Sequence, residues 1–351
     1  MNFSFCLLWI FIQRISTFSF NQPKFCSNAT WNKSAITFAD QNIIGRLPRA
    51  LFINTNNTIY SFNQNTKQIL IWANQSSNPT KNISGNFVGS LSIFVTNVGD
   101  IFIDNGQSNK QVNQWIQRNE SLITVMSVDS QCFGLFVDQN NSLYCSMSNQ
   151  QKVVKRWLND VDLKPKLVAG NGTNGSALNQ LSSPDGIFVD VNFDLYVADC
   201  DNNRIQQFEV GQLNGKTRVG QGSSNVTFTL NGPSGIVLDA QKYFFIVERG
   251  RHRIIREDAN GFRCLVGCAG EGSQSDQLSA PNTLSFDIDG NIFVIDYGNH
   301  RIQKFNFEKT SCNESSVVGT TNQVAESELS TVSLTTTKIE ESLLKLVFIK
   351  K

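Results

Sequence analysis

Short hydrophobic runs recur along this chain in a constant order, with polar turns between them. The clearest copy starts at Pro184–Asp190, continues at Leu195–Asp199 and ends at Arg204–Phe208, and a near copy spans Leu284–Phe305. The polar residue that closes the first run recurs every 42 to 52 residues, at Asn54, Thr96, Asp138, Asp190, Asp239 and Asp287. A second apolar run begins about five residues after each of these positions. Each repeat therefore predicts short antiparallel strands joined by tight turns.

Repeats of about 40 to 50 residues built from short strands are typical of a β-propeller, in which each repeat forms one blade. The sequence predicts an all-β, six-bladed propeller over residues 26–319, with blades near residues 45–72, 90–115, 132–157, 184–208, 233–256 and 281–305. One further apolar run, Ile36–Asp40, precedes the first blade. We expect this N-terminal strand to complete the last blade and close the ring, because an open ring would expose a free sheet edge.

The third run of most repeats ends on an aromatic residue, at Trp72, Trp115, Trp157, Phe208 and Phe305. The fifth repeat has Arg256 at the place we align with Phe208, so its outer packing is expected to differ.

The composition suits a strand-rich folded protein and argues against some partners. Hydrophobic residues make up 40% of the chain and charged residues 17%. The formal net charge is +1, from 30 basic and 29 acidic residues. Since nucleic acids and anionic membranes select strongly basic surfaces, neither is expected as a partner.

The two ends differ from the repeats. Residues 1–20 contain the apolar run Phe3–Ile12 and predict a secretory signal, with a signal anchor or a misassigned start as the alternative. No later stretch reaches the length of about 20 apolar residues that a membrane-spanning helix needs. Residues 320–351 begin with a stretch rich in Ser and Thr and predict a disordered tail.

Seven cysteines follow Cys6, and their irregular spacing matches no zinc pattern. In a secreted protein they predict disulfides, with one thiol left over. Three pairs are candidates: Cys26 with Cys312 as a clasp between the ends of the ring, Cys132 with Cys200 across one face, and Cys264 with Cys268. The last pair requires a sharp bend at Gly267, because an extended strand would separate its ends by about 13 Å.

Glycosylation motifs of the Asn-X-Ser/Thr type also recur and agree with export. The candidate acceptors are Asn28, Asn56, Asn82, Asn119, Asn140, Asn171, Asn225 and Asn313.

The stretch Asp190–Phe208 resembles the NHL repeat, through its strand-ending Asp, its aromatic-aliphatic strand and its Asp-x-x-x-Asn-Arg-Ile motif. The resemblance is close in repeats four and six and weaker in the first two, where Gln68 and Lys110 stand at the Arg position. It implies a six-bladed propeller that serves mostly as a binding platform. The repeated charged residues, Asp199, Arg204, Arg253, Asp296 and Arg301, are interpreted as blade scaffolding, because an Arg can fork two hydrogen bonds to a carboxylate and lock a loop.

Two enzymatic alternatives follow from related propellers. One enzyme group of the NHL family cleaves peptidyl-α-hydroxyglycine, which implies a zinc ion held by three histidines. This chain has only His252 and His300, at equivalent blade positions, so that activity is disfavoured. A calcium-dependent hydrolase of the lactonase or strictosidine-synthase kind is the other alternative. Among the residues that enter the inner strands, Asp185 and Asn282 are suitable oxygen donors, but calcium takes about six to eight.

The interpretation we favour is a secreted, glycosylated and non-catalytic interaction module, expected to be a monomer without a cofactor. Its partner would be an extracellular protein or glycan. Arg249 and Arg251 form a basic loop that other repeats lack, and they are the candidate ligand-binding residues. The simpler alternative is that this loop is only solvated.

Overall fold

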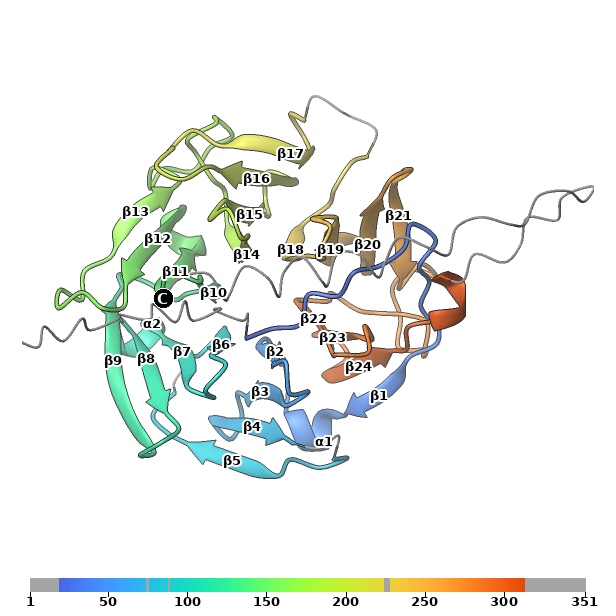
Figure 1. The fold of residues 1–351 in the computed structure, drawn as a ribbon, viewed down its shortest axis with the longest axis horizontal. Helices are drawn as coiled ribbons and strands as arrows, with labels where there is room; N and C mark the ends of the chain where they lie inside the picture. Colours follow the sequence, from blue (N-terminus) through green and yellow to red (C-terminus); the bar gives the residue numbers. More distant parts are fainter. Residues whose placement is uncertain (1–18, 74–75, 88, 224–227, 313–351) are drawn as a thin grey trace, which may run out of the picture. The chain divides into compact units, whose positions relative to one another are not determined.

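The computed structural model describes residues 19–73, 76–87, 89–223 and 228–312, and they form a ring of six four-stranded antiparallel sheets (Figure 1). The first strand of each sheet lines the central channel, and the fourth lies at the rim. The prediction of an all-β, six-bladed propeller is confirmed.

The blades follow one another in chain order. Blade 1 contains β2 (Leu51–Ile53), β3 (Ile59–Asn63), β4 (Gln68–Trp72) and β5 (Lys81–Ser84). Blade 2 contains β6 (Ile93–Val95), β7 (Ile101–Asn105), β8 (Gln111–Ile116) and β9 (Ser121–Ser127). Blade 3 contains β10 (Gly134–Val137), β11 (Ser142–Met147), β12 (Lys152–Trp157) and β13 (Lys166–Ala169).

The second half of the ring is built in the same way. Blade 4 contains β14 (Pro184–Val189), β15 (Leu195–Asp199), β16 (Arg204–Phe208) and β17 (Lys216–Gly220). Blade 5 contains β18 (Pro233–Leu238), β19 (Phe244–Glu248), β20 (Arg253–Asp258) and β21 (Gly261–Val266). Blade 6 contains β22 (Leu284–Phe286), β23 (Ile292–Asp296), β24 (Arg301–Phe305) and β1 (Ile36–Ala39). The short helices are α1 (Gln41–Ile44), α2 (Gly106–Asn109), η1 (Ser148–Gln150), η2 (Arg249–Arg251) and η3 (Lys309–Cys312).

The N-terminal strand closes the ring, as the sequence predicts. Strand β1 pairs with β24 in antiparallel register, with Ile36 opposite Lys304 and Ala39 opposite Ile302. The last blade is therefore made from both ends of the propeller. This pairing removes the free edge that β24 would otherwise present.

Glycines allow the inner strands of neighbouring blades to approach closely. A Cβ atom on Gly186 would lie 2.6 Å from the carbonyl oxygen of Ser234 in the next blade. A Cβ atom on Gly134 would lie 2.9 Å from the carbonyl oxygen of Asp185. Any larger residue at these positions would push two blades apart near the channel.

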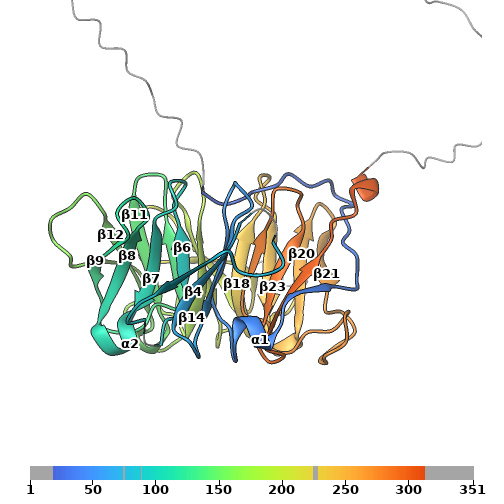
Figure 2. The ribbon, with the colours of Figure 1, turned by 90° about the horizontal axis from the view of Figure 1, so that it is seen from below.

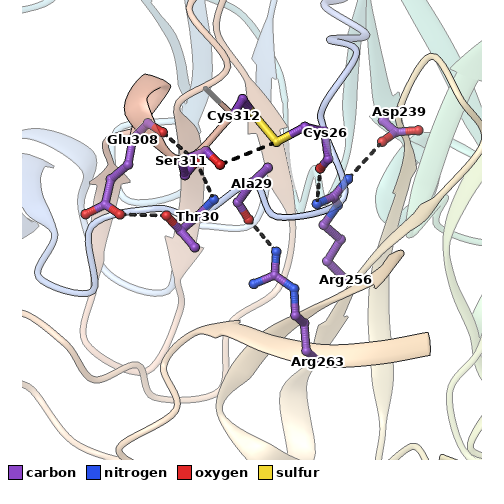
Figure 3. Close-up of a disulfide and its surroundings, with 9 residues drawn as sticks. All are labelled: Cys26, Ala29, Thr30, Asp239, Arg256, Arg263, Glu308, Ser311 and Cys312. Carbon is purple, nitrogen blue, oxygen red and sulfur yellow. Dashed lines mark hydrogen bonds and ion pairs between the residues drawn. A yellow bond between two sulfur atoms is a disulfide. The ribbon is translucent and has the colours of Figure 1, made fainter. Parts of the chain in front are cut away.

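The segment Ser19–Trp31, which we call the N-terminal strap, runs along the face opposite α1 and α2 (Figure 2). Its side chains Phe25 and Trp31 are buried and pack against Phe245 of blade 5. Two arginines of blade 5 donate to backbone carbonyls of the strap, Arg256 to Cys26 and Arg263 to Ala29 (Figure 3). The strap is therefore part of the folded ring.

The strap also explains why blade 5 departs from the repeat. Arg256 lies opposite Phe245, the place that Lys304 takes opposite Phe293 in blade 6. Arg256 therefore does not stand at the position of Phe208, as the comparison of repeats predicted. Glu257 takes that position. Arg256 is fully buried, 3.7 Å from Asp239, and lies over the rings of Phe25 and Phe245. The strand register also corrects the prediction for the second blade. Gln111, not Lys110, takes the position of the repeated Arg, opposite Asn105.

Three disulfides are present in the described part of the chain. Cys26 is bonded to Cys312, so the expected clasp between strap and ring end is found (Figure 3). Cys264 is bonded to Cys268 across the bend at Gly267, whose φ is +74°. The pairing of Cys132 with Cys200 was wrong: Cys132, just before β10, is bonded to Cys145 of β11 within blade 3, and their Cα atoms are 5.1 Å apart. Cys200 is a free cysteine.

The remaining predictions concern the surface and the two ends. Six candidate acceptors are exposed: Asn28, Asn56, Asn82, Asn119, Asn140 and Asn171. Asn225, Asn313, the Ser/Thr-rich tail and residues 1–18 of the predicted signal lie outside the described residues. Within the described residues, no helix is long and apolar enough to span a membrane.

Candidate binding site at the mouth of the central channel

The inner strands enclose a cavity of about 120 Å³ along the axis of the ring. The inner strands begin on the face that carries α1 and α2 (Figure 2), and the residues at which they begin line this end of the cavity, which we call the mouth. The residues at this end stand at the entrances of the six inner strands: Arg49, Leu91, Phe133, Asp185, Ser234 and Asn282. The fold therefore gathers six different side chains at one mouth.

A second group of side chains joins the mouth from the loops that follow the second strand of each blade. In blades 4, 5 and 6 the first residue of this loop is Cys200, Arg249 and Tyr297. Arg249 opens the 3-10 turn η2, which directs its side chain toward the channel and not into solvent. The residue that directly follows the second strand of a blade is thus the loop residue that can reach the mouth, whatever its type.

Arg249 and Asp185 form an ion pair between blades 5 and 4. The Nη2 atom of Arg249 lies 2.6 Å from Oδ2 of Asp185 and also donates to Oδ1 of Asn282. Asp185 is buried, and this burial raises the pKa of its carboxyl group while Arg249 and Arg49 act in the opposite direction. The Asp185 side chain is 6% exposed and that of Arg249 30%, so the arginine forms the accessible side of the pair.

Arg49 supplies a second cation on the opposite side of the mouth. Its guanidinium group lies 4.8 Å from the ring centre of Tyr297 and 5.9 Å from that of Phe133. Its Nη2 atom is 3.4 Å from the Tyr297 hydroxyl oxygen, a long contact. Arg49 forms no salt bridge with any carboxylate in the described part of the chain. Two guanidinium groups therefore share one nearby carboxylate, that of Asp185.

The strap closes the other end of the channel. Phe20 packs edge-on against Phe94, Phe136 and Phe188, with ring centres 5.5 to 6.5 Å apart. The Asn21 side chain donates to the carbonyls of Asn54 and Phe286 at the ends of two inner strands. The channel is thus polar at its mouth and aromatic at its closed end.

The two residues predicted to bind a ligand are separated by the fold. Arg249 points to the channel mouth, as described above. Arg251 instead donates to the backbone carbonyl and hydroxyl oxygens of Thr229 and lies 3.4 Å from Glu248 on the outer side of the loop. Neither Arg49 nor Tyr297 was predicted to bind a ligand, although Arg49 stands at the entrance of an inner strand and Tyr297 directly follows a second strand.

The repeated charged residues pair within their blades. Asp199 with Arg204, and Asp296 with Arg301, make Nε to Oδ2 contacts of 2.7 Å. Arg204 also donates to the carbonyls of Ser176, Ala177 and Gln180 in the loop that enters its blade. In blade 5 the same contact joins Arg253 to Glu248 at 2.6 Å. These pairs hold loops in place at the periphery of the mouth.

The two histidines link adjacent blades. Nδ1 of His252 accepts a hydrogen bond from the Ala280 backbone N–H at 2.9 Å, and Nδ1 of His300 accepts one from Leu47 N–H at 3.2 Å. Asn203 holds the backbone N–H of Gly232 in the same way. No group of three His, Cys, Asp or Glu side chains suited to a metal occurs among the described residues.

The mouth is also a poor fit for calcium. Asp185 and Asn282 are the oxygen donors that a calcium ion would use, but the guanidinium group of Arg249 lies between them and bonds to both. A calcium ion there would meet a fixed positive charge, and Asp185 and Asn282 together supply far fewer than the about six to eight oxygen ligands that calcium takes. The residues present do not fit this cofactor.

Comparison with known proteins agrees with the repeat pattern. Residues 278–305 match the family model of the NHL repeat. The chain is a six-bladed propeller that contains an NHL repeat. The sequence has no match among curated proteins.

Solved structures share the fold of this NHL-repeat propeller at low sequence identity. A protein of unknown function from Bacteroides thetaiotaomicron has 12% identity and a TM-score of 0.61, over 83% of this chain and 75% of that one. An auxiliary nutrient binding protein from Bacteroides ovatus has 14% identity and a TM-score of 0.60, over 84% and 76%. Virginiamycin B lyase from Staphylococcus aureus has 11% identity and a TM-score of 0.54, over 79% and 99%. The fold thus serves both binding proteins and an enzyme.

Proposed function

We propose that this protein is a secreted, glycosylated binding module that holds an acidic group of an extracellular protein or glycan at the channel mouth. The observation that carries the proposal is the convergence of Arg49 and Arg249 on one mouth with Asp185 as their shared carboxylate. This leaves one uncompensated positive charge in a partly buried setting, where an ionic contact is worth more than on an open surface.

The surroundings support recognition more than catalysis. The ion pair of Asp185 with Arg249 occupies the acid that a hydrolase would need, and the histidines are engaged in contacts between blades. Phe133 and Tyr297 flank Arg49 and offer flat apolar surface beside the charge. Rigid aromatic side chains with a neighbouring arginine are typical of binding hot spots.

Export is supported by independent features. Three disulfides are formed in the described residues, and six glycosylation motifs lie on exposed positions. Disulfides persist mainly in oxidising compartments outside the cytosol.

The test is binding of the purified, secreted chain to two arrays, one of acidic peptides and one of sulfated glycans. We expect saturable binding on one array that falls at least ten-fold in Arg49→Glu and weakens as salt rises. Arg118→Glu is the matched control, because Arg118 is exposed at a turn of blade 2. The array that responds identifies the partner class. Absence of binding to both, or equal binding by Arg49→Glu, would refute the proposal.

The enzymatic alternative has its own assay. The chain would be incubated with lactones and aryl esters, with and without added calcium. We expect no hydrolysis above that of Asp185→Ala. Calcium-dependent turnover that Asp185→Ala abolishes would replace the binding proposal.

A further inference from the structure

We propose that the channel is a one-ended pocket for a monocarboxylate with a short apolar tail. Its carboxylate would lie against Arg49 and Arg249, and its tail of about four to six carbon atoms would point toward Phe20. This inference rests on the proposed function and specifies the chemistry of the group that enters the mouth.

The first argument is that the cavity has a floor. Phe20 fills the far end of the channel, in contact with rings from blades 2, 3 and 4. The strap that carries Phe20 is fixed by hydrogen bonds of Asn21 and Gln22 to carbonyls of three inner strands. A ligand can therefore enter only from the mouth, and its length is limited by Phe20.

The second argument is the chemistry of the lower wall. Phe52, Phe94, Phe136 and Phe188 occupy equivalent positions on four neighbouring inner strands and line the cavity. Their ring centres lie close together: Phe94 is 5.2 Å from Phe136 in a tilted contact, and Phe136 is 5.2 Å from Phe188 in an edge-to-face contact. A sugar hydroxyl among these rings would lose its hydrogen bonds, whereas an alkyl or phenyl group would gain from burial.

The third argument is size. The cavity measures about 120 Å³. An apolar cavity of about 150 Å³ in another protein holds one benzene molecule. The pocket therefore suits one small apolar group, not a lipid chain or an extended peptide.

The fourth argument is charge at the mouth. The guanidinium groups of Arg49 and Arg249 face one carboxylate, that of Asp185. One carboxylate from a ligand would bring the summed charge of these side chains and the ligand to zero. Arg49 is held mainly by aromatic faces, and its side chain makes one hydrogen bond among the described residues, the long contact with Tyr297. Its other N–H donors can therefore receive a planar acceptor. A second anion would face the buried charge of Asp185, so the pocket selects one negative charge.

Two sources share this chemistry: a free small acid, and the C-terminus of a peptide that ends in an apolar residue. The experiment uses calorimetric titration of the purified full chain at low salt. The probes are hexanoate, its neutral counterpart hexanamide, and a short peptide ending in Leu as the free acid or as the amide.

We expect hexanoate or the peptide acid to bind at least ten-fold more tightly than its amide. The variant Arg49→Gln should abolish that difference, while Arg118→Gln should keep it. The acid that binds more tightly identifies the source. If acid and amide bind equally, or if neither acid binds at millimolar concentration to the folded protein, the inference is wrong.

The floor is tested by chain length. With the wild-type chain, affinity should rise from butanoate to hexanoate and fall at decanoate. Phe20→Ala, or Phe20→Leu if the alanine variant does not fold, should shift the preference to longer acids. An unchanged length preference in a folded Phe20 variant would refute the one-ended pocket. Binding to an acidic array without binding of any monocarboxylate would refute this inference and leave the proposed function standing.

Discussion

Removal of the Cys26–Cys312 disulfide should destabilise the propeller more than removal of the Cys132–Cys145 disulfide. The clasp joins residues 286 positions apart, whereas the second disulfide joins residues 13 apart. In the chain-entropy model a cross-link restricts the unfolded chain more when it closes a longer loop. The model gives about 5.6 kcal/mol for the clasp and about 2.9 kcal/mol for the short loop, a difference of about 2.7 kcal/mol.

The folded state should add to this difference. The clasp fixes the strap, which buries Phe25 and Trp31 and receives hydrogen bonds from Arg256 and Arg263 (Figure 3). The strap continues into β1, whose pairing with β24 closes the ring. Without the clasp, this end can separate from the ring before the rest unfolds. We therefore expect the calculated difference to be a lower limit.

The assay compares two double variants, Cys26→Ser with Cys312→Ser and Cys132→Ser with Cys145→Ser, by equilibrium unfolding in urea. Circular dichroism first establishes that both are folded. The clasp variant should also be cut by protease within the N-terminal strap under native conditions, while the other variant should resist. Equal losses of unfolding free energy, or a larger loss for the short loop, would contradict the argument, since loop length would then not govern the effect.

Three further predictions follow from individual side chains. Burial raises the pKa of Asp104 to about 7, so between about pH 4 and 7 the folded state retains a proton that the unfolded chain has lost. The free energy of unfolding should therefore fall as pH rises through this range, by at most about 4 kcal/mol. Asp104→Asn should flatten that pH dependence in urea titrations; an unchanged slope would contradict the assignment. Arg204→Ala should cost about 3 kcal/mol or more, because it leaves a buried carboxylate unpaired; a loss below about 1 kcal/mol would argue against this. The intact mass of the mature protein should include Phe20, the last residue of the predicted signal, since its ring closes the channel; a mature chain that starts after it would disprove this.

The sequence was sufficient to predict the fold because the information is repeated. Six copies of one strand pattern predict six blades, and the extra run at Ile36–Asp40 needs a partner, which β24 provides. The pairing of Cys132 could not be predicted in this way. Two cysteines within one blade and two on adjacent blades are equally compatible with the repeat. The path of the chain just before β10, which brings Cys132 close to Cys145 of β11, decides between them.

The mouth could be predicted only in part. Its six entrance residues follow from the repeat, because each stands at or just before the start of the first strand of its blade. The direction of Arg249 does not follow, because it depends on the η2 turn that sets the first loop residue toward the channel and Arg251 away from it. Closure by Phe20 was not predicted, because this residue was assigned to the end of the signal, residues 1–20, and a single apolar residue there carries no pattern that assigns it to a cavity.

Blade 5 shows how departures from a repeat can serve both faces of one ring. On one face it provides Arg256 and Arg263, which bind the strap and so fix the floor of the channel. On the other it provides Arg249, which pairs with Asp185 of blade 4 and bonds Asn282 of blade 6. None of these three arginines takes part in the repeated pair of Glu248 with Arg253. Since that pair already holds the blade loop, the three additional arginines can fix the two ends of the channel. We place the ligand between these ends, with its carboxylate at the mouth and its tail toward Phe20.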